Sequence, residues 1–221
     1  TNFINDNLIK FVRCLSPYSN SNMLGSSYIK FLTNEIKKRI DNKENINSLN
    51  VSRCVKGFFK LKDVFGDTSG HDQESIFNFC SDAFLNNSSK MPKMDERFIS
   101  VMLSNLNKDT QNDKQFDCFH FEKAKSTRNI MAALVACSQI GLHTILIGRT
   151  GLGKTAAAMA LSRMNKLAPK KTSPYIISFN GETRLDELYG FFTIEKGNLS
   201  LHQGELSQAM FDGQVFIAPI R

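Results

Sequence analysis

The sequence predicts an α/β domain with a mainly parallel sheet, preceded by a helical region. In residues 1–106 the apolar side chains recur at helical spacing. In residues 118–221 short apolar runs alternate with helical segments, and strands that alternate with helices form parallel sheets. The polar stretch 107–117 lies between the two patterns and is predicted to be a linker.

Four helices are predicted in the first part from apolar residues three or four positions apart. Ser26 or Ser27 can cap the start of the first one. The apolar positions are Tyr28, Ile29, Leu32, Ile36 and Ile40; Val51, Val55, Phe58 and Phe59; Ile76, Cys80, Ala83 and Phe84; and Phe98, Ile99, Met102 and Leu106. The polar run 86–90 separates the third helix from the fourth.

The second part is predicted to begin with a helix that Thr127 caps and Gly141 ends. A strand over 144–147 follows, and the helix behind it ends before Pro169. The remaining predicted elements are a strand over 175–179, a helix over 183–189, a hairpin of 191–194 and 199–201, a helix over 204–210 that Gly213 ends, and a strand over 215–218.

Residues 148–155 read G-R-T-G-L-G-K-T and fit the pattern G-x-x-x-x-G-K-[ST] between a strand and a helix. Glycines let backbone N–H groups surround a phosphate, and the helix N-terminus adds partial positive charge. Lys154 would reach the β- and γ-phosphates, and the Thr155 hydroxyl would ligate Mg²⁺. The predicted phosphate-binding residues are Gly148, Arg149, Thr150, Gly151, Leu152, Gly153, Lys154, Thr155 and Ala156. The chain is therefore predicted to bind a nucleoside triphosphate, or to descend from one that did.

The net charge of +7 is unevenly distributed along the 221 residues. Residues 121–172 carry nine Lys and Arg against one acid, whereas residues 173–221 carry three bases against six acids. A basic neighbourhood suits a polyanionic ligand. Nucleic acid is the less favoured partner, because basic patches are more often solvated faces and the sequence lacks the interleaved aromatic and basic residues of a nucleic-acid module.

The five cysteines are scattered and never form a C-x-x-C pair. This pattern argues for a reducing compartment and against a disulfide framework or a zinc site. The sequence shows neither a signal peptide nor a membrane span, so we expect an intracellular location, in the cytoplasm or nucleus. Because the first residue is Thr1, we expect a piece of a longer protein.

These motifs resemble AAA+ ATPases of the dynein-related branch, which contains midasin. The resemblance covers roughly residues 120–218. It rests first on the helix, strand and phosphate loop, and on the turn and helix of 180–190. It rests also on the hairpin that follows and on the stretch 204–213, which is similar to the family's G-x-L-x-x-A-x-x-x-G. The resemblance implies ATP with Mg²⁺, an α/β P-loop AAA+ sheet, neighbouring AAA+ modules of the same chain as partners, and a macromolecular assembly as substrate.

The first part resembles the helical lid that ends a preceding AAA+ module. Residues 50–56 are similar to the family's S-x-R-x-V-x-R helix, which implies that Arg53 is a sensor 2 residue; an exposed arginine on a bundle helix is the alternative. Mysterin-type AAA+ ubiquitin ligases show a similar order of lid and ATPase.

The family's Walker B strand ends in Asp-Glu, but here residues 215–218 are followed by Pro219, Ile220 and Arg221. The pair Asp186–Glu187 imitates that motif without an apolar strand before it, so solvated helix charges are the favoured interpretation. The family's strand order further implies that 144–147 has no neighbour among the strands present in this sequence.

Three functions follow from these observations. The leading one, which the resemblance implies, is an ATP-binding module of a large motor or remodelling protein, midasin-like and acting in ribosome maturation, with ATP hydrolysis expected only in the complete protein. The second is a non-catalytic nucleotide-binding scaffold module, which the absent acidic pair favours. A small-molecule P-loop kinase is the third, and the hairpin and the helical front half disfavour it.

Overall fold

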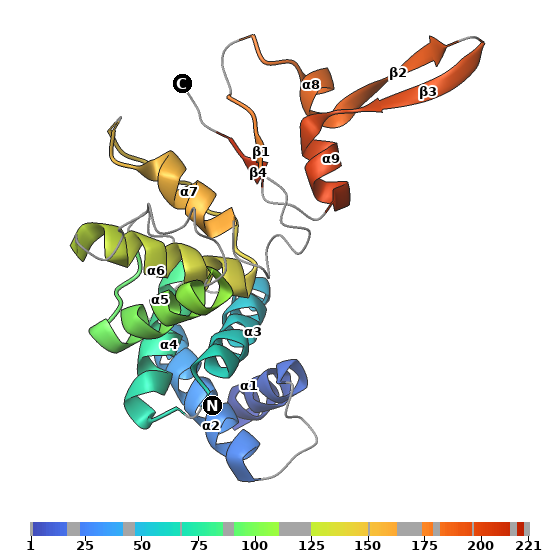
Figure 1. Cartoon of the computed structure of the whole chain (residues 1–221). Helices are drawn as coiled ribbons and strands as arrows, with labels where there is room; N and C mark the ends of the chain where they lie inside the picture. Colours follow the sequence, from blue (N-terminus) through green and yellow to red (C-terminus); the bar gives the residue numbers. More distant parts are fainter. Residues whose placement is uncertain are drawn as a thin grey trace. The chain divides into compact units, whose positions relative to one another are not determined.

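A computed structural model describes residues 2–16, 23–41, 47–66, 68–85, 91–110, 125–149, 151–162, 174–178, 182–195, 197–212 and 216–218 (Figure 1). The chain divides into two compact units. The helical unit comprises Thr1–Leu103 and Ala132–His143, and the phosphate-loop unit comprises Ser104–Met131 and Thr144–Arg221.

Five helices form most of the helical unit: α1 (Asn2–Leu15), α2 (Met23–Asp41), α3 (Ser48–Phe65), α4 (Gly70–Phe84) and α5 (Glu96–Thr110). The helices predicted from apolar spacing are confirmed as α2 to α5. The predicted Ser26 or Ser27 cap is wrong, because α2 already begins at Met23 and both serines lie within its first turns. The polar run 86–90 and residues 111–117 of the predicted linker lie outside the described residues, while 107–110 form the end of α5.

Aromatic side chains dominate the core of the helical unit. Phe58, Phe77, Phe79 and Phe98 are essentially inaccessible to solvent. Phe79 of α4 stacks on Phe98 of α5 with ring centroids 5.0 Å apart. Pairs of this kind add to the hydrophobic free energy of burial, so these contacts fix how the helices meet.

Asp72 links α4 to α5 through a charge that is almost fully buried. Its carboxylate accepts a 2.8 Å hydrogen bond from the backbone N–H of Ser69, which completes a capping box at the start of α4. The other carboxylate oxygen lies 2.7 Å from Nε of Arg97 on α5. A buried carboxylate needs such partners, because an unpaired charge in the core is costly.

Helix α6 (Lys125–Ile140) contributes its second half to the helical unit. The predicted stop at Gly141 is confirmed: its φ is +75°, and the N–H of Leu142 donates a 2.8 Å hydrogen bond back to the carbonyl of Cys137. The predicted Thr127 cap is wrong, because α6 begins two residues earlier and Thr127 lies inside it.

The phosphate-loop unit contains short elements: α7 (Lys154–Ser162), β1 (Tyr175–Ile176), α8 (Leu185–Tyr189), β2 (Gly190–Glu195), β3 (Asn198–Gln203), α9 (Glu205–Asp212) and β4 (Phe216–Ile217). Strands β2 and β3 form the predicted antiparallel hairpin. Strands β1 and β4 pair in parallel over two residues each, Tyr175 with Phe216 and Ile176 with Ile217.

The predicted strand over Thr144–Ile147 is wrong for the described structure, where these residues form no regular element. Ile145 is 81% exposed and Ile147 is 92% exposed. A strand exists only through hydrogen bonds to a neighbour, and no described strand lies beside this segment. The predicted P-loop parallel sheet is therefore not shown. Phe179, Val215, Gly213 and Pro169 lie outside the described residues.

None of the described helices combines the length and the apolar character needed to cross a bilayer.

Candidate functional site

The phosphate-loop segment ends where α7 begins, at Lys154. Gly151 and Gly153 have φ values of +84° and +73°, which side chains other than glycine rarely adopt. The N–H of Ala157 donates a 2.9 Å hydrogen bond to the carbonyl of Gly153, so the first helical turn starts directly from the loop. The remaining N–H groups of that first turn are those that a helix leaves without internal acceptors.

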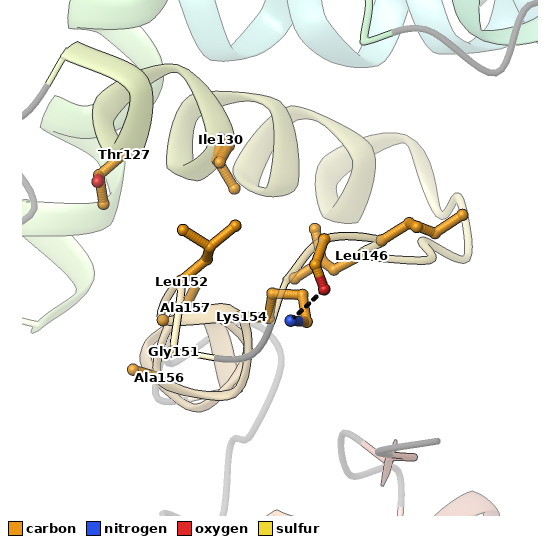
Figure 2. A pocket seen from close by; sticks show the side chains of 11 residues that line it. Thr127, Ile130, Leu146, Gly151, Leu152, Lys154, Ala156 and Ala157 are labelled. Carbon is orange, nitrogen blue, oxygen red and sulfur yellow. Dashed lines mark hydrogen bonds between the residues drawn. The ribbon is translucent and has the colours of Figure 1, made fainter. Parts of the chain in front are cut away.

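The side chain of Lys154 folds back onto its own loop (Figure 2). Its ammonium donates hydrogen bonds of 2.8 Å to the carbonyl oxygen of Gly148 and 2.7 Å to that of Arg149. The ammonium of Lys154 therefore lies at the position around which the loop curves. An anion bound there would have to replace these two carbonyl oxygens as acceptors.

A hollow of about 360 Å³ lies over the loop. Its walls come from the start of α6, from the segment before the loop, and from the loop and first turn of α7. The lining residues are Thr127, Ile130, Leu146, Ile147, Gly148, Gly151, Leu152, Gly153, Lys154, Ala156 and Ala157. Figure 2 shows Ile130 and Leu152 pointing toward one another across it. The hollow thus combines a cation and backbone donors with an apolar wall.

Most of the predicted phosphate-binding residues line this hollow: Gly148, Gly151, Leu152, Gly153, Lys154 and Ala156. Arg149 and Thr155 are exposed beside it, and Thr150 lies outside the described residues. The residues fit a polyphosphate, because the lining contains a lysine and no acidic side chain. Among the described residues no cluster of three potential metal ligands occurs.

Thr127 and Ile130 were missed as site residues by the sequence analysis, which assigned Thr127 to a helix cap and gave Ile130 no role in a site. No sequence motif marks them, because their role depends on α6 lying beside the loop. The helical pattern directly before the loop was the available signal.

The acids that imitate Walker B do not line the hollow. Asp186 and Glu187 are exposed in the first turn of α8, in agreement with solvated helix charges. Residues 219–221, which follow the predicted last strand, lie outside the described residues. Arg53 is exposed on α3 in the helical unit, and its sensor 2 role stays a prediction.

Comparison with protein families gives one match, over about a third of the chain. Residues 143–218 match the AAA domain of the dynein-related subfamily. This AAA segment contains the whole loop, the hairpin and both strands of the parallel pair. The match supports a nucleotide-binding AAA+ module. No curated protein and no solved structure matches the chain.

Proposed function

We propose that the AAA segment binds ATP with Mg²⁺ as the nucleotide-binding part of an AAA+ module. The observation that carries this proposal is the loop geometry: Lys154 and the two glycines of positive φ meet at the N-terminus of α7, beneath a hollow lined by this loop. This arrangement supplies backbone donors, a helix terminus and a cation to one anion.

Each residue has a distinct role in this proposal. Lys154 leaves the carbonyl oxygens of Gly148 and Arg149 and donates instead to phosphate oxygens. Thr155, which is exposed beside the loop, would ligate the metal that accompanies the phosphates. Ile130 and Leu152 provide apolar surface for the base or ribose. ATP supplies the phosphoanhydride whose hydrolysis can drive movement in AAA+ proteins.

The wider proposal is a large multi-module motor or remodelling protein of the midasin-like type. It is supported by the resemblance of residues 180–213 to that branch and of residues 50–56 to a lid helix. Neighbouring modules of the same chain would complete the site, and a macromolecular assembly, in ribosome maturation, would be the substrate. A mysterin-type protein has the same order of parts and is the alternative within AAA+ proteins.

A non-catalytic scaffold module is the second candidate. The observation that favours it is the absence of an acidic side chain among the residues that line the described hollow, together with the sequence Ala218-Pro219-Ile220 in place of the family's acidic pair. AAA+ hydrolysis needs a carboxylate that orients water, and trans-acting arginines contribute factors of about 10³ to 10⁵ in related phosphoryl transfers.

The decisive binding experiment is calorimetric titration of the 221-residue chain with ATP and Mg²⁺. Lys154→Ala should weaken binding roughly 10- to 100-fold, because a hydrogen bond to a charged group contributes about 1.5–3 kcal/mol. Lys56→Ala removes an exposed lysine from α3 of the helical unit and is the matched control. Equal affinity of wild type and Lys154→Ala would contradict the proposal.

Phosphate release separates the two candidates. We expect negligible steady turnover by residues 1–221, since the residues that line the described hollow include no acid to orient water. Sustained release that Lys154→Ala abolishes would show that another residue does this work and would remove the scaffold candidate. Phosphorylation of an added small molecule would instead indicate a kinase.

A further inference from the structure

The hairpin of β2 and β3 carries an apolar face that the described residues leave uncovered. The register pairs Phe192 with Leu201 and Ile194 with Leu199. Directly opposed residues, and residues two apart on one strand, share a face, so these four side chains lie together. They are 68%, 52%, 75% and 70% exposed, respectively. In Figure 1 the hairpin extends away from α8 and α9 as an arm.

The opposite face of the hairpin is different. There the ring of Phe191 stacks on that of His202 with centroids 5.2 Å apart, and the next pair is Thr193 with Ser200. Hydroxyl and imidazole groups interrupt this face, whereas on the first face two successive pairs are apolar and Gln203 follows them toward the base of the hairpin. Large exposed apolar patches are rare on monomers and mark interaction sites.

The base of the hairpin is held by close backbone contacts. Gly190 has a φ of +98°, and a Cβ there would collide with the carbonyl oxygen of His202. A Cβ on Gly204 would collide with the carbonyl group of Leu188. The hydroxyl of Ser207 on α9 donates a 2.9 Å hydrogen bond to the carbonyl of Tyr189 on α8. The apolar face is therefore presented on an anchored element, which lowers the ordering cost of binding.

The segment that contains this arm is acidic in sequence. Residues 182–212 contain six acids and two bases, Glu182, Asp186, Glu187, Glu195, Glu205 and Asp212 against Arg184 and Lys196. Glu187 precedes the hairpin and Glu205 follows it, and both side chains are exposed. Negative charge of this kind repels nucleic-acid phosphates and favours a basic partner.

The spacing of the apolar pairs suits a helix. Successive pairs on one face of a hairpin are about 7 Å apart along the strands, and side chains four residues apart on a helix are separated by about 6 Å. A second copy of this chain suits the face less well, because its own hairpin lies in the same acidic segment.

We infer that the Phe192, Ile194, Leu199 and Leu201 face of the hairpin docks a basic amphipathic helix of another protein, with Glu187 and Glu205 contacting its basic side chains. This interaction does not depend on bound nucleotide, so it can fail or succeed separately from the ATP proposal.

The test uses a fluorescent helical peptide of about 18 residues, or five turns, with leucines at i, i+3, i+4 and i+7 and lysines elsewhere. The full chain should bind it. Phe192→Ser with Leu201→Ser should weaken binding roughly tenfold or more, since the double substitution removes two of the four apolar side chains that the helix would cover. Leu49→Ser, a similarly exposed leucine on α3, should leave binding unchanged. Glu187→Gln should weaken binding about two- to fivefold, as expected for one exposed ion pair.

Two further ligands, a scrambled peptide and a single-stranded oligonucleotide, test whether the face selects an amphipathic helix. A peptide of the same composition with scrambled leucine positions should bind at least about tenfold less tightly, because its apolar side chains cannot share one face. Equal binding of the two peptides, no binding of the amphipathic one, or no effect of the Phe192 and Leu201 substitutions would overturn the inference. Binding of a single-stranded oligonucleotide that the same substitutions abolish would assign the face to nucleic acid instead. Circular dichroism of the variants checks that the chain remains folded.

Discussion

The ammonium of Lys154 lies 2.8 Å from the carbonyl oxygen of Gly148, six residues earlier in the chain. This bond closes the loop around the lysine itself, and the bond to Arg149 reinforces it. The loop shape that would receive a phosphate is therefore held by the residue that would contact the phosphate. Glycine conformations at Gly151 and Gly153 allow that closure.

Gly153→Ala should weaken ATP binding because the loop would have to leave its present conformation. Gly153 has a φ of +73°, and an alanine there costs roughly 1–2 kcal/mol, or about a tenfold loss of affinity. Gly66→Ala is the matched control, since Gly66 has a φ of +74° and also leaves open space around its Cβ position, but lies at the end of α3. Calorimetry on both variants checks this, and equal affinities would contradict it.

Predictions from the sequence were confirmed for features that one local segment determines. They failed for features that need a second segment of the chain. The helices followed from apolar spacing, and the hairpin from the turn residues Glu195 to Asn198, because both signals are contained in one stretch of sequence. Residues 144–147 have the composition of a buried strand, but a strand also needs a partner, and none of the described strands provides one. The helix starts at Ser26 and Thr127 were wrong because serine and threonine are also tolerated inside helices.

The same distinction applies to the candidate site. Lys154 and the glycines were predictable, because the loop pattern itself specifies phosphate chemistry. Ile130 and Thr127 were not, because they join the site only through the packing of α6 beside the loop.

Asp95 should make the stability of the helical unit depend on pH. Its carboxylate accepts a 2.7 Å hydrogen bond from the N–H of Phe98 at the start of α5. Partial burial alone would raise the pKa of Asp95, but hydrogen bonds from Ser75 and Phe98 and the nearby His71 together lower it below the ordinary 3.8. A lowered pKa stabilises the folded chain above the ordinary pKa, and that contribution is lost as the pH falls through the folded value.

We therefore expect Asp95→Ala to cost about 0.5–2 kcal/mol in urea unfolding at neutral pH, the usual value of a helix cap. The deficit should shrink at pH values below 3.8, the ordinary pKa of the group. Glu74→Ala, an exposed acid on α4, is the control and should cost little at either pH. A deficit that does not change with pH would show that the charge of Asp95 does not contribute.

Cys54 and Cys80 should be unreactive in the folded chain. Burial raises the pKa of the Cys54 thiol to about 12, with Arg39 opposing the shift, and burial also raises the pKa of Cys80 well above its ordinary value. At pH 8 a pKa of about 12 leaves roughly one thiolate in ten thousand, and the thiolate is the reactive form. Alkylation mapped by mass spectrometry should label the exposed Cys14 in the native chain and Cys54 only after denaturation. Rapid native labelling of Cys54 would show that the helical core opens readily.

The exposed segment Thr144–Ile147 should drive self-association. Ile145 is 81% exposed, and the segment belongs to none of the described strands, so it can add to a strand of another chain, as apolar strand edges do. Ile145→Lys should shift the full chain several-fold toward monomer in sedimentation velocity, because a charge at such an edge blocks pairing. Leu49→Lys, on an exposed helical position, is the control and should leave the distribution of monomer and oligomer unchanged.

We expect a fragment of residues 115–221 to associate or unfold, because the same exposed segment is present in it. A monomeric 115–221 fragment with a sharp thermal transition would show that the segment already has its strand partners, and would contradict the strand order that the AAA+ resemblance implies.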